Sequence, residues 1–330
     1  MLNLLTIMLL SVIYGCMRMP VRTIASCEIE ERTIYLALNE KYELGEEGFE
    51  SDDPLIAEVV DGTIVGKSKG ETIISSSCVQ YKVSVSDLYT EEKLEMNKEY
   101  LKPYLYSEEE NRYLDEVLSY LIDKAGYQTR AGAVEAARFL LLRFPYKLKY
   151  FYENGRLTSE TDVADGEGRY YHYGLYLSKY KQKELSVIQN GPAVWGEDMF
   201  EDYTETYNQN GLDCSGFVTW ALYNAGFDPQ DIGAGPSDDK YDLTDIGDKV
   251  AIEDLDIDMI KTGDLVGLDG HVGMVIGKDD QKIYIGEMYW VKDLQVRIFT
   301  YEEFLNDSPW EYVMLMDDFY QADGNLSDSW

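Results

Sequence analysis

The fold is decided by Gly211-Leu212-Asp213-Cys214-Ser215-Gly216-Phe217-Val218, a stretch that predicts the start of a helix. Downstream apolar residues recur at helical spacing, and a glycine follows as a helix stop: Val218, Ala221, Leu222, Ala225 and Gly226. Cys214 would lie in the first turn, where the positive end of the helix dipole favours a thiolate. Because cysteines outside disulfides are often small buried hydrophobes, the helix alone does not decide whether Cys214 is reactive.

A cysteine nucleophile needs a base, and the chain has two histidines, His172 and His271. His271 opens the second of two apolar runs, residues 265–268 and 272–276, which are separated by Asp269-Gly270. Asp-Gly between such runs predicts a β-hairpin with His271 at the start of its second strand. A third strand is expected at residues 283–287, where the carboxylate of Glu287 could orient the imidazole. Nucleophile, base and orienter in this arrangement are typical of thiol hydrolases.

These motifs together resemble the NlpC/P60 cysteine peptidases. Asp213-Cys214-Ser215-Gly216-Phe217 is followed roughly 50 residues later by Gly263-Asp264-Leu265 and Gly270-His271-Val272-Gly273, and preceded by Gly191-Pro192-Ala193-Val194-Trp195-Gly196. The resemblance covers about residues 191–316 and implies a circularly permuted papain-like fold. It also implies cleavage of short peptides of the bacterial cell wall, with Cys214 as nucleophile and His271 as base.

The resemblance assigns further residues and has two departures. Asp213 and Ser215 match positions that line the substrate pocket, and Trp195 is expected at the substrate as well. The third polar residue of the family is often His, Asn or Gln, and here Glu287 takes that role. The family tyrosine before the nucleophile is replaced by Ala193, which puts one transition-state contact and the usual substrate in question.

Composition narrows the class of partner. The 330 residues suffice for two or three domains, and 29 basic against 62 acidic residues give a formal charge of −33. This charge argues against binding to nucleic acid or to an anionic membrane surface. No cysteine–histidine spacing indicates zinc. The proposed chemistry needs neither metal nor organic cofactor, and peptidoglycan peptides are the expected partner.

The first 26 residues are expected to be an export signal or a lipoprotein or membrane anchor. Residues 1–16 form an apolar run of about the length of a signal-peptide core, ending in Gly15-Cys16. No basic residue precedes the run, and Tyr14 fits a lipoprotein processing site poorly. A start displaced from a longer upstream anchor is the alternative. Both interpretations predict an extracellular or cell-surface protein, and an anchor segment would hold it to a membrane.

Residues 27–88 predict a separate β unit. Short alternating apolar runs, such as Ile34, Leu36, Leu38 and Val79, Tyr81, Val83, Val85, are separated by glycine-containing turns. Segments around Gly45, Pro54, Gly62 and Gly70 resemble the bacterial Ig-like (group 2) domain, which implies a spacer or adhesion module on a cell surface. Cys27 and Cys78 would be able to pair in an exported protein, but spacing alone does not fix their geometry.

Residues 89–183 predict a helical extension. One helix follows Leu114, Val117, Leu118, Leu121 and Ile122, and a second covers residues 130–143 before Phe144-Pro145. His172 lies among tyrosines, so a packed or surface aromatic is favoured over a substrate contact. Residues 197–207 form an acidic insert beside the nucleophile segment, either a solvated loop or a site for a cationic amine. The polar tail, 321–330, is expected to be disordered.

The sequence therefore predicts a multidomain chain: an all-β Ig-like sandwich, a helical linker or cap, and an α+β papain-like domain over residues 184–320. The predicted function is a cysteine peptidase that hydrolyses peptidoglycan stem peptides through a thioester. Two alternatives stay open. One is a cell-surface protein that binds wall peptides without cutting them, and the other is a thiol amidase or transferase that acts on another amide.

Overall fold

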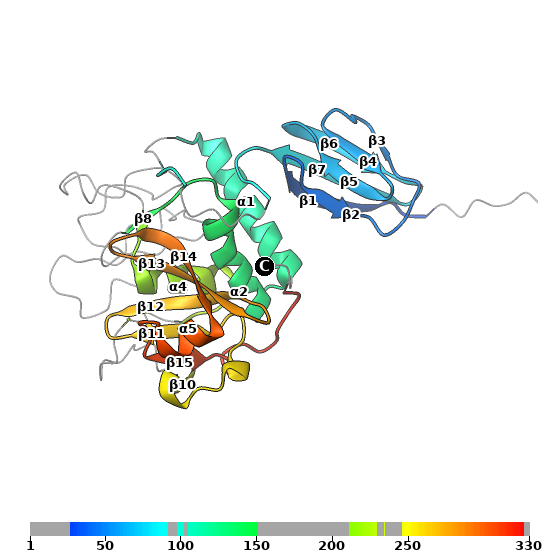
Figure 1. Ribbon diagram of the computed structural model, residues 1–330. Coiled ribbons are helices and arrows are strands. Elements are labelled where there is room, and N and C mark those ends of the chain that lie inside the picture. Colours follow the sequence, from blue (N-terminus) through cyan, green and yellow to red (C-terminus); the bar gives the residue numbers. More distant parts are fainter. Residues whose placement is uncertain are drawn as a thin grey trace, which may run out of the picture.

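The computed structural model describes residues 27–91, 98–101, 105–150, 211–229, 234 and 246–326. They form a multidomain chain of β-sheets with some helices (Figure 1). Residues 30–86 build a small β unit, and the later helices surround a second, larger sheet. The expectations for residues 1–26, His172, Ala193, Trp195 and the 197–207 insert lie outside the described residues.

The β unit contains two sheets that enclose one apolar core. The larger sheet has the order β1-β7-β6-β3, with β1 and β7 parallel, and the smaller has the order β2-β5-β4. The strands are β1 (Glu30–Ala37), β2 (Lys41–Glu43), β3 (Glu50–Ser51), β4 (Ala57–Val60), β5 (Thr63–Gly66), β6 (Gly70–Ser75) and β7 (Val79–Ser86). Alternation brings Ile34, Tyr81 and Val83 inward, as the sequence predicts. Leu38 follows the end of β1 and is exposed instead.

A disulfide joins Cys27 to Cys78 and closes the outer end of the β1–β7 pair. The backbone N–H of Glu30 donates to the Cys78 carbonyl at 2.9 Å beside it. The pairing that the sequence left open is therefore formed in the structure. It links residues 51 positions apart, so it restricts the unfolded chain over most of the unit.

Two helices and a π-turn follow the β unit. Helix α1 (Glu108–Ala125) begins with a capping box, in which the Ser107 hydroxyl accepts from the Glu110 N–H and the Glu110 carboxylate accepts in return. Helix α2 (Arg130–Arg138) is capped by Thr129 and continues directly into the π-turn η1 (Phe139–Arg143). The sequence predicts one helix over this whole stretch, whereas the last five residues are wound more loosely.

The second sheet has six antiparallel strands in the order β10-β15-β11-β12-β13-β14. Its members are β10 (Asp248–Ala251), β11 (Leu265–Leu268), β12 (His271–Lys278), β13 (Lys282–Tyr289), β14 (Asp293–Thr300) and β15 (Tyr312–Leu315). Short strands β8 (Lys149–Tyr150) and β9 (Gly211–Leu212) pair beside it, and η3 (Ile252–Asp254) and η4 (Ile257–Met259) follow β10. Gly270 has φ +74° in the β11–β12 turn, as the Asp-Gly hairpin signal predicts.

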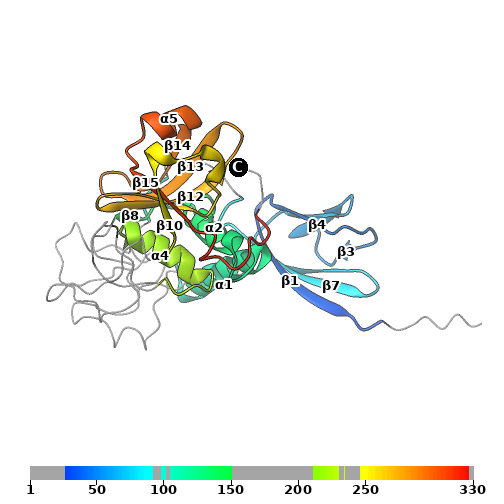
Figure 2. The same ribbon diagram turned by 90° about the horizontal axis from the view of Figure 1, so that it is seen from below.

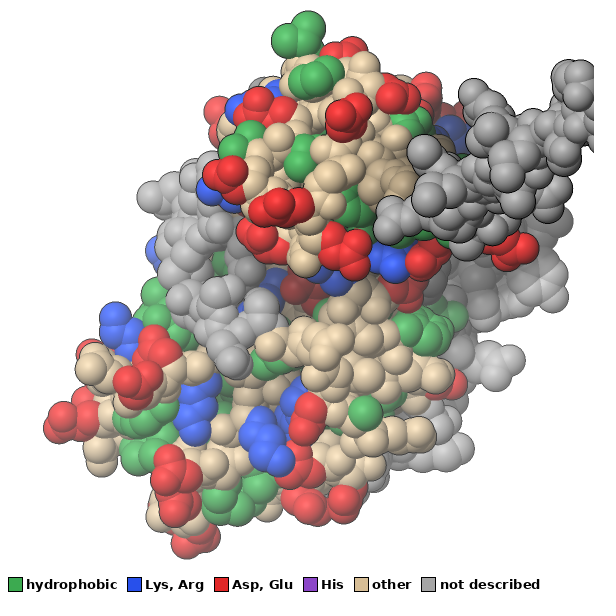
Figure 3. Space-filling view, turned by 90° about the vertical axis from the view of Figure 1, so that its right-hand side faces the viewer, with side chains coloured by type: hydrophobic (Ala, Val, Ile, Leu, Met, Phe, Trp, Pro, Cys, Tyr) green, Lys and Arg blue, Asp and Glu red, His purple; other side chains and the backbone are tan. Residues whose placement is uncertain are grey.

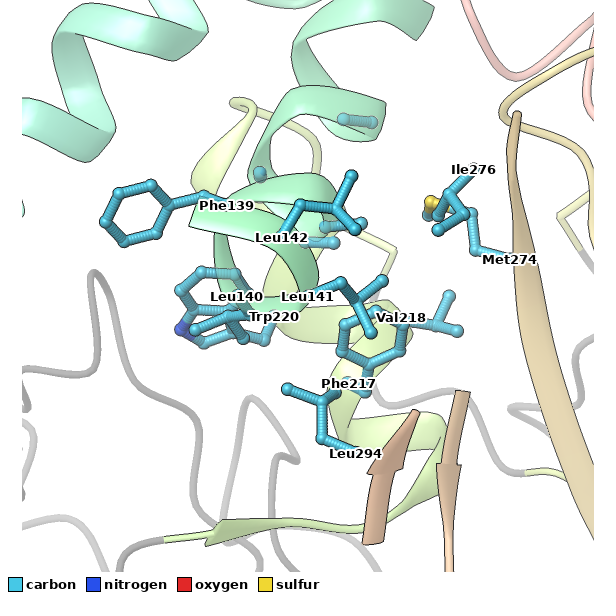
Figure 4. Close-up of a cluster of buried hydrophobic side chains, with 14 of the residues drawn as sticks. Phe139, Leu140, Leu141, Leu142, Phe217, Val218, Trp220, Met274, Ile276 and Leu294 are labelled. Atoms are coloured by element: carbon cyan, nitrogen blue, oxygen red, sulfur yellow. The ribbon is translucent and has the colours of Figure 1, made fainter. Parts of the chain in front are cut away.

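Helices cover both faces of this sheet. Helix α4 (Cys214–Asn224) packs on β12 and β13 together with α2, and α5 (Tyr301–Asn306) packs on the other side (Figure 2). Figure 4 shows the contact between η1, α4 and the sheet. Its labelled residues are Phe139, Leu140, Leu141, Leu142, Phe217, Val218, Trp220, Met274, Ile276 and Leu294, all in one buried cluster. The helices before residue 150 therefore share a core with the sheet.

Arg130 ties the start of α2 to the chain's C-terminal part. It is 3% exposed and donates to the Asp264 carboxylate at 2.8 Å, while its guanidinium lies 4.7 Å from the Tyr320 ring centre. The backbone N–H groups of Arg130 and Ala131 donate to the carbonyls of residues 322 and 323 at 2.9 Å. The expectation of a disordered tail is wrong for these residues, because they satisfy donors at a helix N-terminus.

The β unit contacts the helices through a polar and aromatic joint. Arg143 Nη2 donates to Glu40 at 2.6 Å, and Tyr35 Oη donates to Glu116 at 3.2 Å. The Tyr35 ring also meets the Tyr113 ring edge-on, with centroids 5.5 Å apart. These contacts fix the end of β1 that lies nearest α1.

The surface matches the charge of the chain. On the face in Figure 3 the acidic side chains are spread over the described residues, and lysines and arginines lie among them. None of the helices in the described part of the chain has the length and apolar character needed to span a membrane.

Candidate active site

Cys214 occupies the first position of α4, as the sequence predicts. The helix follows directly after β9, and its core-facing residues Phe217, Val218 and Ala221 are fully buried. The thiol itself is 5% exposed and is not part of a disulfide. Helix packing therefore holds the sulfur at the positive end of the α4 dipole.

Asp213 caps α4, and its carboxylate weakens the stabilisation that the helix dipole would give to a thiolate at Cys214. Its Oδ1 accepts from the Gly216 N–H at 2.6 Å and from the Ser215 hydroxyl at 3.2 Å. The helix end carries about half a positive charge, which a neighbouring carboxylate opposes. A thiolate at Cys214 would therefore need a further cation. Asp213 and Ser215 are 4% and 3% exposed, so the two expected pocket residues lie buried beside the nucleophile position.

His271 begins β12 immediately after the Gly270 turn. Its ring lies parallel to the indole of Trp310, with centroids 5.4 Å apart and an interplanar angle of 15°. The Tyr289 ring meets it from another side at 5.3 Å. With 8% exposure, the imidazole is packed against two aromatic rings and has little rotational freedom.

Glu287 on β13 holds the imidazole, as the sequence predicts. Its Oε2 lies 2.6 Å from His271 Nε2, and the carboxylate is fully buried. In the antiparallel register Glu287 lies opposite Gly273, two residues along β12 from His271. This diagonal places the two side chains on one face of the sheet.

Sequence reasoning missed two residues that engage the other oxygen of Glu287. Gln295 Nε2 donates to Oε1 at 2.6 Å, and Arg297 Nε lies 3.6 Å from the same atom. Arg297 also lies 5.9 Å from the centre of the Trp310 ring, so contacts link Arg297, Glu287, His271 and Trp310 in a closed loop. An arginine beside a buried carboxylate offsets the cost of burying its charge. The sequence feature that could have identified them is the alternation of side chains along β14, which puts residues 295 and 297 on one face of the sheet.

Cys214 lies at the same end of the sheet as His271. Residue 212 of β9 pairs with Tyr150, and the Tyr150 N–H donates to Asp293 at 2.8 Å. Asp293 pairs with Tyr289, whose ring contacts His271. This path connects the residue two positions before the nucleophile to the ring that contacts the base.

Cys214 and Trp310, the ring on which His271 stacks, belong to different buried clusters. Cys214 belongs to the cluster that contains Val272 and Met274, on the side of α4. His271 and Gly273 alternate with these residues, and His271 stacks on Trp310, which belongs to the cluster on the opposite side. The contacts around His271 are with Glu287, Tyr289 and Trp310. The structure thus brings His271 and Glu287 together and places the segment that carries Cys214 at the same end of the sheet.

The site combines a thiol, an imidazole and a buried carboxylate. An imidazole paired to a carboxylate can accept a proton and can be stabilised as a cation, which suits acid–base work beside a thiol. Within the described residues, no group of three or more His, Cys, Asp and Glu side chains is arranged to hold a metal ion. Trp195 and Ala193 lie outside the described residues, so that side of the site is not part of this geometry.

Comparison with known proteins found no protein-family model, curated protein or solved structure that matches this chain significantly.

Proposed function

We propose that this protein is a cysteine peptidase of the NlpC/P60 type that hydrolyses amide bonds in peptidoglycan stem peptides. The single observation that carries the proposal is the His271–Glu287 pair. A histidine 2.6 Å from a fully buried carboxylate, whose other oxygen contacts Gln295 and Arg297, is the base-and-orienter arrangement that thiol hydrolases use. The order of Cys214, His271 and Glu287 along the chain supports the same reaction class through the resemblance.

In the proposed reaction His271 takes the proton of the Cys214 thiol, and the sulfur attacks the carbonyl carbon of the scissile amide. The C–N bond then breaks, and His271 returns the proton to the leaving amine. Water, deprotonated by His271, attacks the thioester, releases the carboxylate product and restores the thiol. Glu287 keeps the imidazole oriented and stabilises it while it carries the proton.

The helix start supplies the expected oxyanion contacts. The Gly216 N–H is already taken by Asp213, so the N–H groups of Cys214 and Ser215 are proposed to meet the oxyanion. Loss of one such donor typically costs about 3 kcal/mol of transition-state stabilisation.

The proposal also covers the fold family of each unit and the location of the protein. The two-sheet β unit is proposed to be Ig-like, and the helix–sheet unit to be papain-like. An exported protein is proposed because a disulfide between Cys27 and Cys78 persists in oxidising compartments and is rare in the cytosol.

The test is a digest of purified cell-wall peptides, read by mass spectrometry. We expect the wild type to produce a new pair of fragments, and Cys214→Ala and His271→Ala to produce none above background. Circular dichroism and thermal melting establish that each variant is folded. Leu55→Ala is the control, because Leu55 is 80% exposed on the β unit, away from the site. Full hydrolysis by a folded Cys214→Ala variant would sink the assignment.

A second candidate is a protein that binds wall peptides without cutting them. The observation that favours it is the environment of Cys214, a thiol that is 5% exposed and directly follows the buried Asp213 carboxylate. If wild type and Cys214→Ala retain the same peptides equally on a column and neither cuts them, the binding function replaces the peptidase.

A further inference from the structure

The β13–β14 turn presents an exposed aromatic surface. Trp290 is 71% exposed and Val291 is 53% exposed, and Tyr100, which contacts the same turn, is 42% exposed. A single exposed apolar side chain needs no explanation. Trp290 and Val291 are adjacent in the turn, and Tyr100 is hydrogen-bonded to Asp293 of the same turn, so three exposed apolar side chains belong to one small part of the surface.

This turn is held firmly in place. Asp293, with φ +60°, closes it, and the Lys292 N–H donates to the Tyr289 carbonyl at 2.9 Å. The Asp293 carboxylate accepts from the Tyr150 N–H at 2.8 Å and from the Tyr100 hydroxyl at 2.6 Å. The hydrogen bond to Asp293 raises the pKa of Tyr100 to about 12, so its hydroxyl remains a donor at neutral pH. A fixed turn can present an indole to a ligand with little loss of entropy.

The exposed indole lies close to the candidate active site. The Trp290 ring is 6.3 Å from the Tyr289 ring, and the Tyr289 ring is 5.3 Å from His271. Two ring contacts therefore separate Trp290 from the proposed base. A substrate seated at His271 and extended past Tyr289 would meet the face or edge of Trp290.

The charge around the turn favours a neutral ligand. Lys292 follows Trp290 and Val291 directly, and Lys147 Nζ lies 5.7 Å from the Tyr100 ring centre. The nearby carboxylate of Asp293 is already engaged by two donors. Two lysines at this turn argue against a cationic amine as its ligand. A ring with an aliphatic face and polar edges suits an indole beside a lysine and a tyrosine hydroxyl.

We propose that Trp290 and Tyr100 form a platform for a sugar ring of the glycan that carries the stem peptide. The proposal rests on the proposed function, because the glycan is attached to the peptide that this site would cut. It makes the protein selective for peptides that are still joined to their sugars.

The experiment compares two substrates that share the scissile bond. One is a stem peptide linked to its N-acetylated disaccharide, and the other is the same peptide with the disaccharide removed. We expect wild-type kcat/KM to be about 3- to 10-fold higher for the disaccharide-linked peptide, chiefly through KM, since one aromatic contact contributes on this scale. Trp290→Ala should bring that ratio close to one, and Trp290→Phe should retain part of it. Leu55→Ala is the matched control and should keep the wild-type ratio.

Equal kcat/KM for the two substrates in the wild type would overturn the platform while leaving the peptidase intact. Retention of the wild-type ratio by Trp290→Ala would do the same. If the wild type cuts neither substrate, the peptidase proposal fails. A binding measurement then tests the sugar platform on its own. In that case the disaccharide alone is titrated against Cys214→Ala and Cys214→Ala/Trp290→Ala by NMR. Saturable binding only with Trp290 present supports the platform, and equal or absent binding overturns it.

Discussion

The β unit and the helix–sheet unit differ in what they bury. Among residues 27–91 the buried polar side chains are the uncharged Thr72, Ser84 and Ser86. The described part of the helix–sheet unit buries seven basic or acidic side chains, histidine included: Arg130, Arg138, Arg143, Asp213, Asp264, His271 and Glu287. Burial of a charge is expensive unless it is paired, so such groups are concentrated where a geometry must be specified.

The buried charges of the helix–sheet unit fall into groups with different effects. Arg130 and Asp264 join α2 to the loop before β11, far in sequence but adjacent in space. His271 and Glu287 orient a side chain that can carry a proton. The β unit does neither, and its apolar core and one disulfide account for its order. We therefore assign the proposed chemistry to the helix–sheet unit and a supporting role to the β unit.

Breaking the Arg130–Asp264 pair should have the largest effect. The two side chains are 4% and 1% exposed, and Asp264 also accepts from the backbone N–H groups of Lys261 and Met316. Asp264→Ala leaves the guanidinium and these donors without that carboxylate, so we expect a loss of about 3–5 kcal/mol in the free energy of unfolding of this unit. Urea denaturation followed by tryptophan fluorescence measures it.

Arg32→Met in the β unit is the matched control. Arg32 pairs with Glu30 on the surface, where ion pairs contribute less than about 1 kcal/mol. A similar loss for both variants would show that burial does not distinguish the two pairs.

Removing the disulfide should destabilise the β unit and spare the site. Cys27→Ser/Cys78→Ser releases the constraint on the unfolded chain, and the expected loss is about 2–4 kcal/mol. Hydrogen exchange should rise over β1, β6 and β7 and stay unchanged over β12 and β13. An equal rise of hydrogen exchange in both sheets would mean that the contacts between the β unit and the helices couple the stability of the two units strongly.

Glu287→Gln should lower the rate of the proposed hydrolysis by roughly 10- to 100-fold, because an amide cannot stabilise the protonated imidazole as a carboxylate does. Gln295→Ala should have a smaller effect in the same direction, on kcat more than on KM. Single-turnover kinetics with folded variants measure both. An unchanged rate in Glu287→Gln would assign the orientation of His271 to its aromatic neighbours.

The smallest effect is expected at Asp317. Its hydrogen bond from Lys261, together with Arg130, lowers the pKa of this carboxyl below its ordinary value of 3.8. The stabilisation is therefore present above about pH 4 and is lost as the pH falls through the lowered pKa. Asp317→Asn should flatten the decline of stability below pH 4, by less than about 1 kcal/mol because the group is exposed. An identical acid profile in both proteins contradicts this.

Local patterns predicted much of the fold and part of the site. The helix at Cys214, the hairpin before His271 and the contact of Glu287 with His271 follow from periodicity, a turn signal and strand alternation. Each depends on residues close in sequence or on neighbouring strands. The contacts of Gln295 and Arg297 were accessible to the same reasoning one strand further along.

The remainder depends on contacts between distant segments. The loose turn η1 and the binding of residues 322–323 at the start of α2 have no local signature, because their partners lie elsewhere in the chain. The pairing of Arg130 with Asp264 spans 134 residues, so local sequence patterns do not predict it either. The placement of Cys214 at the end of the sheet where His271 lies is also tertiary, and alternation gives the face of His271 only after the strand order is known.

The parallel pairing of β1 and β7 has a mechanical consequence. The chain enters β1 at Glu30 beside Cys78 and leaves β7 at Ser86 near α1, so entry and exit lie at opposite ends of the unit. An antiparallel pair would return the chain to its starting end. Eight residues of strand span about 26 Å. Cys27 therefore lies about one strand length from the end of the unit that contacts α1, and the disulfide keeps β1 and β7 joined at that far end.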